Sequence, residues 1–191
     1  MDADGLTYSV CEDNSPVEEP TYVEPCCACN EAKYEVIFEG IWSRHTHPKD
    51  LPKDEWQTQF STLIGASHSV NYTLWEYGRL ASPALQLLGE RGRTRKLENE
   101  MKRYSQAIRS VIKAHGLQQR SNVIGQTFAV FRVDQNHHLL SLVSKMIPSP
   151  DWIVGLSKEN LCLANCSWVP NRVVDLFPWD IGTNSGLSYQ S

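Results

Sequence analysis

Residues 127–147 read TFAVFRVDQNHHLLSLVSKMI, and this stretch is the most informative part of the chain for the fold. It contains two runs, 127–133 and 139–147, in which β-branched, aromatic and aliphatic residues dominate. A polar turn through Asp134 and Asn136 separates them. Short apolar runs bounded by turn residues are typical of β-strands. The stretch therefore predicts two strands joined by a turn.

Outward from this stretch, four more segments have strand-like composition: residues 34–38, 69–77, 151–156 and 172–177. From the first of them onward, Tyr34, Val36 and Phe38 alternate with Glu35, Ile37 and Glu39, which is close to the period of two that a strand requires. The glycine at position 40 should end that strand. These segments predict a fold built mainly from strands.

Two helices are expected between residues 77 and 127. Ser82-Pro83 resembles an N-cap followed by proline at the first helical position, with Leu85 and Leu88 as a short buried stripe behind it. A second helix is predicted because apolar residues recur mostly at spacings of three and four, namely Leu97, Met101, Tyr104, Ile108, Val111 and Ile112. Helices inserted as a block, rather than alternating with strands, favour an antiparallel β-sandwich with inserted α-helices.

The composition suits one globular core. The chain has 191 residues, of which 41% are hydrophobic and 21% charged. Its net charge of −4 gives no electrostatic reason to expect nucleic acid as a partner. No window approaches the roughly 20 apolar residues of a membrane-spanning helix, so membrane insertion is not expected. Residues 1–25, with three prolines among several acids, are predicted to be a linker, and residues 26–191 the domain.

Two observations about the cellular compartment conflict. The N-terminus lacks the charged start and apolar stretch of a secretory signal. In contrast, the six cysteines suggest cross-links, and the sequons at Asn71 and Asn165 could be glycosylated only in the secretory pathway. The conflict resolves if Met1 is not the natural start and the chain is part of a longer secreted protein. We therefore expect the chain to be secreted.

The cysteines allow two interpretations. Cys26 and Cys27 are adjacent and Cys162 and Cys166 lie four apart, so two neighbouring disulfides could join these pairs. Alternatively, zinc could be bound by Cys26, Cys29, Cys162 and Cys166, because Cys26 and Cys29 have the spacing that zinc sites favour. The additional thiol of Cys27 counts against zinc. Disulfides are the preferred interpretation.

Two polar segments near the C-terminus could bind calcium. They read PSPDW at 148–152 and PWDIGTNSG at 178–186, and each places an acid beside tryptophan, close to a strand. Asp151, Asp180 and Asn184 supply the oxygen ligands that calcium prefers. The alternative is that these side chains only form hydrogen bonds within their own turns, as Asp and Asn near glycine often do.

Motifs of catalysis are missing from the sequence. It contains no nucleophile elbow, zinc-protease helix, phosphate-binding glycine loop or dinucleotide fingerprint. The histidine pairs His45/His47 and His137/His138 lack a spaced third metal ligand and are interpreted as residues of solvated turns. An enzyme is not expected.

Several short motifs resemble a known family, the spondin domain of F-spondin and mindin. In chain order they are CCAC at 26–29, AKY at 32–34, HTHPKD at 45–50, LIGASH at 63–68, LWEYG at 74–78, PSPDW at 148–152 and PWD at 178–180. They extend over nearly the whole chain, and the match is closer to F-spondin. The resemblance implies a β-sandwich with inserted helices that follows a reeler domain and precedes thrombospondin repeats. Residues 1–25 would then be a linker or a remnant of the reeler domain, in which Cys11 has lost its partner.

The resemblance also implies specific sites. Asp151 and Asp180 would be two of the family's three calcium ligands, and Asn184 stands where a third carboxylate is usual. The implied disulfides are Cys26 with Cys162 and Cys27 with Cys166, and Cys29 would pair with a cysteine beyond residue 191. An amide at position 184 removes one negative charge, so weaker calcium binding is expected.

The function implied is non-enzymatic. The domain would be a calcium-binding adhesion module that supports cell or axon attachment and guidance through cell-surface receptors and matrix components. Two alternatives are a calcium-dependent lipid-binding β-sandwich and, from another class, a hydrolase that uses Asp180 and a histidine such as His68.

Overall fold

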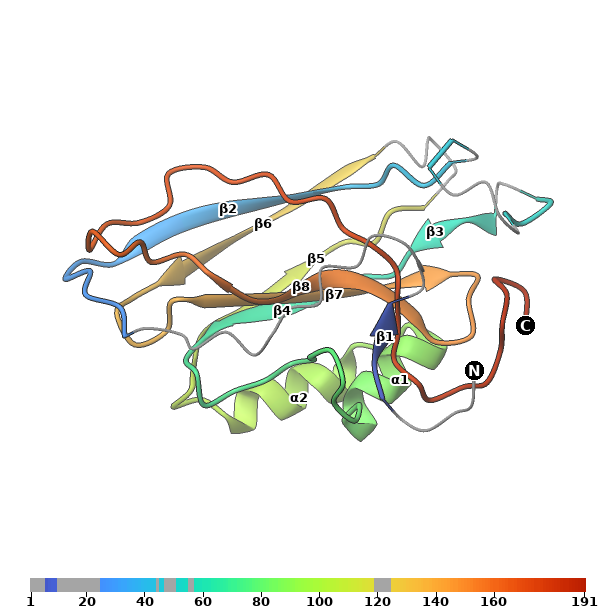
Figure 1. Ribbon diagram of the computed structural model, residues 1–191, viewed down its shortest axis with the longest axis horizontal. Coiled ribbons are helices and arrows are strands. Elements are labelled where there is room, and N and C mark those ends of the chain that lie inside the picture. Colours follow the sequence, from blue (N-terminus) through green and yellow to red (C-terminus); the bar gives the residue numbers. More distant parts are fainter. Residues whose placement is uncertain (1–5, 10–24, 44, 47–50, 55–56, 119–124) are drawn as a thin grey trace.

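The computed structural model describes residues 6–9, 25–43, 45–46, 51–54, 57–118 and 125–191. The described chain forms three layers: a two-stranded ribbon, a larger sheet and a pair of helices (Figure 1). All strand pairs are antiparallel. The prediction of a mainly β sandwich with inserted helices is confirmed, and the helices cover the face of the large sheet opposite the ribbon.

The large sheet has seven strands, and its order along the main path is β1 (Tyr8–Ser9), β9 (Trp179–Asp180), β8 (Trp152–Asn160), β7 (Leu139–Ile147), β4 (Leu63–His68) and β5 (Ile108–Ala114). The short strand β3 (Gln59–Phe60) pairs with the end of β7. The ribbon consists of β2 (Ala32–Glu39) and β6 (Gln126–Val133). The turn at residues 134–138 therefore carries the chain from the ribbon into the large sheet.

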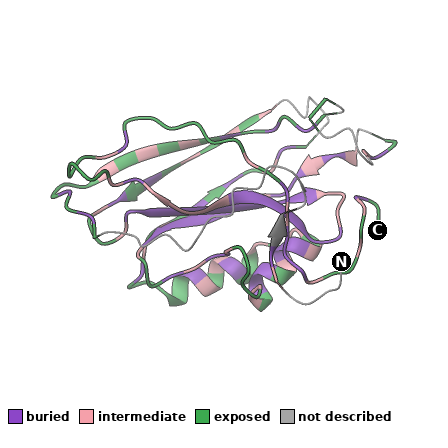
Figure 2. Ribbon diagram, in the orientation of Figure 1, coloured by how far each residue is buried: buried purple, intermediate pink, exposed green. Residues whose placement is uncertain are grey.

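The central strands of the large sheet are buried on both faces, as Figure 2 shows. One face packs against the ribbon through residues such as Phe131 and Leu142, and the other packs against the helices through residues such as Val143 and Ile153. A strand covered on both sides needs no alternation of apolar and polar residues. This explains why residues 139–147 are mostly apolar and show no alternation of apolar and polar positions.

Helix α1 (Pro83–Arg91) begins as predicted. The hydroxyl of Ser82 accepts a hydrogen bond from the backbone N–H of Leu85 at 3.1 Å, and proline follows at the first helical position. Gly92 ends the helix with φ of 66°, a conformation that glycine adopts without a Cβ penalty. Leu85 and Leu88 are fully buried against the sheet, which confirms the predicted stripe.

The predicted long helix over residues 97–112 is wrong in its second half. Helix α2 (Arg95–Arg103) buries Leu97 and Met101, but the chain then turns and residues 108–114 form strand β5. Ile108 and Ile112 lie four residues apart, a spacing that fits the same face of a helix or of a strand. Pairing of β5 with β4 decides for the strand.

Two predicted strands are absent. Residues 69–77 form turns after β4. Tyr72, Leu74 and Trp75 instead fill the helix-side core, where Trp75 donates a hydrogen bond to the Leu142 carbonyl at 3.1 Å. Residues 172–177 pair with no strand in the described part of the chain, and Val173 is 88% exposed. We call residues 169–177 the strap.

Residues 1–25 were expected to contribute no element, but β1 lies within them and pairs with β9. Leu6 forms a β-bridge with Leu80, and a Cβ on Gly182 would lie 2.1 Å from the Leu6 carbonyl oxygen. This contact requires glycine, which also has φ of 70° there. Residues 10–24, with Cys11, lie outside the described residues. The domain boundary after residue 25 stays a prediction.

The two predicted disulfides are present. Cys26 bonds Cys162 and Cys27 bonds Cys166, with Cα atoms 5.8 and 4.7 Å apart. They join the segment that leads into β2 to the loop after β8. The zinc alternative is wrong because three of its four ligands, Cys26, Cys162 and Cys166, are disulfide-bonded. Among the described cysteines, Cys29 is free and exposed.

Candidate functional site

The candidate site lies where strands β8 and β9 pair at one edge of the large sheet. Trp152 lies opposite Asp180 in the ladder, and Asp151 immediately precedes Trp152, so the register places the two acids close together. Asp151 is fully buried and Asp180 is 4% exposed. Asn184 lies in the loop after β9 and is exposed.

The carboxylate of Asp151 is only half satisfied. Its Oδ2 accepts hydrogen bonds from the backbone N–H of Thr183 at 2.7 Å, the Thr183 hydroxyl at 3.1 Å and the backbone N–H of Asn184 at 3.0 Å. Its Oδ1 is buried and has no hydrogen-bond partner among the described residues. A buried acceptor without a partner is costly, so this oxygen is available to a ligand.

The other two candidate residues bind their own loop. Asp180 Oδ1 accepts from the backbone N–H of Gly182 at 2.7 Å, and Asn184 Oδ1 accepts from that of Gly186 at 3.0 Å. The alternative of turn-internal hydrogen bonding therefore describes these two side chains. It does not describe Asp151, which holds a loop some 30 residues away in the chain.

The electrostatics of the pair are unfavourable without a cation. Burial raises the pKa of Asp151 and that of Asp180, and the charge of Asp151 further raises the pKa of Asp180. Lys145 is nearby, but its ammonium donates to backbone carbonyls, including that of Ser149 at 2.7 Å. Burial lowers the pKa of Lys145 to about 8. No ion pair joins either carboxylate to a described cationic side chain.

This donor set fits a hard cation such as calcium. It offers an orphaned carboxylate oxygen, a second buried carboxylate and an amide in the adjoining loop, all of which are oxygen donors. The described residues contain no group of three His, Cys, Asp or Glu side chains that could hold a metal. Further protein ligands would therefore come from amide or backbone oxygens.

Thr183 and Lys145 help to build the site, and neither was predicted from the sequence. Thr183 supplies two of the hydrogen bonds to Asp151, and Lys145 fastens the loop before Asp151 to α1 through the Gly89 carbonyl. Gly182 lets the Asp180 loop lie against Leu6. Only the pattern of glycines after Asp180 was visible in advance.

The acid–histidine pair of the hydrolase alternative is not brought together. His68 lies opposite Leu139 at the start of β7, whereas Asp180 lies near the level of Lys145 at its other end. Six residues of strand separate these levels, about 20 Å. His68 is fully buried, with its ring nitrogens 2.8 Å from the Ser69 carbonyl and 2.7 Å from the Ser141 hydroxyl. Its role is structural.

The buried His68 should make the fold sensitive to acid. Burial lowers its pKa to about 4, below the ordinary 6.5, so the unfolded chain takes up a proton first as the pH falls. The stability from the neutral ring is complete above pH 6.5 and is lost between pH 6.5 and 4, in total about 3 kcal/mol. His68→Gln should reduce the fall in unfolding free energy over this range, as measured by urea denaturation.

The control for this prediction is His45→Gln, because His45 lies in an exposed turn. Both variants keep the same titrating carboxyl groups, so the contribution of these groups to the pH dependence of the unfolding free energy cancels in the comparison. Equal pH dependence in His68→Gln and wild type would contradict the assignment.

The histidines at 137 and 138 form hydrogen bonds within a turn, and the two sequon asparagines are exposed. His137 contacts the Asp134 carboxylate at 2.8 Å and the Gln106 carbonyl at 3.0 Å, and His138 contacts the Gln135 carbonyl, so these two hold a turn together. His47 lies outside the described residues. Asn71 and Asn165 are exposed, and their glycosylation stays a prediction.

No helix in the described residues is long and apolar enough to cross a membrane.

Comparison with protein families matches residues 32–191 to the family described as Spondin_N. The matched residues include every element from β2 to β9 and all three residues of the candidate site.

Individual relatives agree with this match. The chain is 45% identical to Spondin-1 of Gallus gallus over 198 residues and to Spondin-1 of Homo sapiens over 196 residues, covering 100% of this chain and 24% of each relative. It is 36% identical to Spondin-2 of Homo sapiens over 166 residues, covering 87% of this chain and 50% of that protein. The chain thus spans about a quarter of the length of the Spondin-1 relatives.

Proposed function

Since the chain belongs to the Spondin_N family, we propose that it is a calcium-binding adhesion module without enzymatic activity, which supports cell or axon attachment and guidance. The protein is secreted and belongs to the extracellular matrix. Its two disulfides accord with an oxidising compartment. Its partners would be cell-surface receptors and matrix components.

The observation that carries the calcium part is the pair of buried acids, which form no ion pair with a described cationic side chain, although the charge of Lys145 acts against the rise in the pKa of Asp151. Asp151 keeps one buried oxygen unpartnered, and Asp180 lies beside it with a raised pKa. Buried carboxylates are normally neutralised by a proton, a cationic side chain or a metal ion. Calcium, when bound, would supply the positive charge that both carboxylates lack.

Each residue of the site would then have a distinct role in coordinating the ion. Asp151 and Asp180 would supply charged oxygens, and Asn184 a neutral one after releasing the Gly186 N–H. Thr183 would keep Asp151 oriented through its two hydrogen bonds. The loop 182–186 would thereby be fastened to the β8–β9 edge, which gives the module one rigid end.

The direct test is isothermal titration calorimetry of the oxidised domain with calcium chloride. Heat of binding with one site per chain supports the proposal. Absence of binding at millimolar calcium would remove the calcium part and leave the adhesion part untouched.

Asn184→Asp should bind calcium about tenfold more tightly than wild type, because a third carboxylate adds charge to the site. The matched control is Asn171→Asp, which adds the same charge at an exposed position on the strap. Calorimetry compares the three dissociation constants. Equal tightening by both substitutions would assign the effect to net charge rather than to position 184.

The adhesion part is tested by cell attachment to surfaces coated with the domain. Attachment above that to a coating of reduced, unfolded domain supports it, and loss of attachment with a chelator would link it to calcium. Equal attachment to folded and unfolded coatings would contradict it. Extension of axons on the same coatings tests the guidance role.

The structure disfavours the lipid-binding alternative. Its apolar residues beside Asp180 are Trp179 and Ile181, but Ile181 is fully buried and Trp179 packs against Trp75 and Tyr77. Neither presents an apolar tip to a membrane. Calcium-dependent sedimentation with anionic liposomes would reverse this preference.

A further inference from the structure

One edge of strand β2 has no backbone pairing with the described residues, and we call it the free edge. All eight of its residues pair with β6 on one side. The strap runs along its other side (Figure 1), yet no backbone hydrogen bond joins the strap to β2 in the described residues. The contact is made by side chains, such as the Tyr34 hydroxyl, which donates to the Val169 carbonyl at 2.6 Å. A free edge of this length is a template for another strand.

The register identifies the unpaired backbone groups. The N–H of Gly40 donates to the Gly125 carbonyl, which continues the β2–β6 ladder by one residue pair. Hydrogen-bonded and non-hydrogen-bonded pairs alternate in an antiparallel ladder. The N–H and C=O groups of Glu35 and Ile37 therefore point away from β6, toward the strap.

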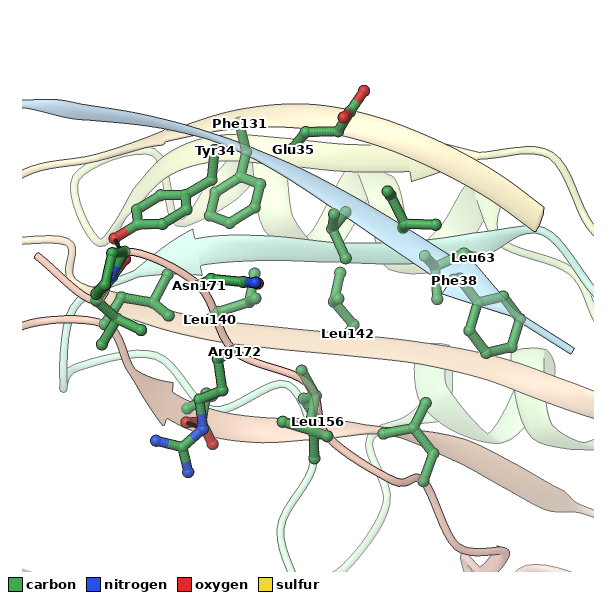
Figure 3. A pocket seen from close by; sticks show the side chains of 18 residues that line it. Tyr34, Glu35, Phe38, Leu63, Phe131, Leu140, Leu142, Leu156, Asn171 and Arg172 are labelled. Carbon is green, nitrogen blue, oxygen red and sulfur yellow. Dashed lines mark hydrogen bonds and ion pairs between the residues drawn. The ribbon is translucent and has the colours of Figure 1, made fainter. Parts of the chain in front are cut away.

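A cleft of about 210 Å³ opens between this edge and the strap. Its floor is apolar and includes Leu140, Leu142 and Leu156 (Figure 3). The consecutive residues 34–38 all line it, although neighbouring side chains of a strand point to opposite faces. The Glu35 side chain points away from the cleft, so at this position the backbone forms the wall.

The inward face of β2 is also incompletely covered. Tyr34 and Val36 point toward the core but are only half-buried. On the outward face Ile37 is 57% exposed beside Phe128, its cross-strand partner, which is 67% exposed. Large apolar side chains are thus accessible on both faces of one free edge, which is typical of an interaction site.

Around Ile37 the outward charges of the edge are acidic, whereas Lys33 near the start of β2 is basic. Glu35 and Glu39 flank Ile37 on the outward face, and both are exposed. The ion pairs among the described residues involve neither of them. A strand lying beside β2 would meet an apolar position between two acidic ones.

We propose that the free edge of β2 binds an extended segment of a partner protein by β-strand addition. The segment's backbone would pair with Glu35 and Ile37, and its alternate apolar side chains would enter the cleft above Leu140 and Leu142. Its outward side chains would be apolar beside Ile37 and basic beside Glu35 and Glu39. The cleft exceeds the roughly 150 Å³ that holds a benzene molecule, so it admits a large apolar side chain. The main-chain pairing supplies affinity and the cleft supplies selectivity.

The test uses a fluorescent nine-residue peptide that alternates valine with threonine and carries lysine at each end. Binding to the oxidised domain is measured by fluorescence anisotropy, together with two peptides N-methylated at alternate positions. Antiparallel addition uses the N–H groups of every second residue, so one methylation pattern should weaken binding at least tenfold and the complementary pattern should leave it unchanged.

Two variants of the domain test the same edge. Ile37→Pro removes an N–H that faces the strap but spares the β6 ladder, and should weaken peptide binding at least tenfold. Ile37→Thr keeps the N–H and a β-branched side chain, and should weaken it less than threefold. The methylated peptides test the wild-type domain, so they decide the question even if Ile37→Pro does not fold.

Three outcomes would overturn the proposal. The first is no binding at millimolar peptide. The second is equal weakening by both methylation patterns, which would indicate a pocket for apolar groups alone. The third is a dimer in sedimentation velocity that the peptide does not dissociate, because a second copy would then occupy the edge.

Discussion

Removal of both disulfides should unfold the domain at 25 °C. Each bridge spans a long loop, with sequence separations of 136 and 139 residues. In the chain-entropy estimate a single cross-link of this span stabilises by about 5 kcal/mol. The second bridge then closes only a ring of a few residues, which adds about 2 kcal/mol. The sum is comparable with the whole stability of a typical domain, about 5–15 kcal/mol.

The two bridges should therefore be strongly non-additive. Cys27→Ser with Cys166→Ser should cost about 2 kcal/mol, and removal of the second pair from that background about 5 kcal/mol more. Denaturant unfolding monitored by circular dichroism measures both steps. Cys29→Ser is the matched control, because its thiol is exposed and free, and it should change nothing. If the two steps lowered the unfolding free energy equally, the second bridge would not be closing a small ring within the loop of the first, which would contradict the prediction.

Asp151→Asn should abolish stabilisation by calcium while leaving the calcium-free domain at least as stable as wild type. The amide can keep accepting from Thr183 and Asn184, and it removes a buried charge next to Asp180. Wild type at a hundredfold excess of calcium over its dissociation constant should gain about 2.7 kcal/mol of unfolding free energy. The variant should gain none, as thermal denaturation with and without calcium would show.

Asp175→Asn is the control for Asp151→Asn, because it makes the same chemical change at an exposed strap position. It should retain the full calcium response. If the two variants respond alike, Asp151 is not a ligand. If calcium-free Asp151→Asn is strongly destabilised, the buried charge has a partner that the geometry does not reveal.

The pH dependence of calcium binding follows from the same two acids. Their pKa values are raised by burial, so protons compete with calcium at a higher pH than for exposed carboxylates.

The stability of the calcium-free domain also depends on pH. Without calcium, the raised pKa values of Asp151 and Asp180 mean that the folded state holds protons more tightly than the unfolded state. Stability from these groups is therefore present at low pH and lost as the pH rises through the folded pKa.

Local signals predicted several elements correctly because each lies within a few residues. The Ser82-Pro83 start of α1 depends on one hydroxyl and one ring. The alternation at 34–38 and the apolar run at 139–147 match strands β2 and β7. The cysteine pairs and the acids at 151 and 180 stood out by spacing, and the family resemblance specified the two disulfide pairings and the calcium ligands. Spacing alone had left zinc and turn hydrogen bonds open.

The errors arose where one local pattern is compatible with two structures. The spacing of Ile108 and Ile112 fits a helix or a strand, and the edge of β4 decided for a strand. Residues 172–177 have the composition of a strand, but the described chain gives them no ladder. Residues 69–77 place Tyr72 and Trp75 in the core from turns, which no periodicity indicates.

By itself, the sequence determined the class of the fold, the start of its first helix and the residue types available for calcium. Those properties depend on neighbours along the chain. Only the tertiary structure decided that, among the described residues, Asp151 leaves one oxygen unpartnered, Lys145 is held by carbonyls and the edge of β2 has no backbone partner. Each of these depends on which groups distant in sequence meet, because a buried polar atom or a strand edge is satisfied only by what packs against it.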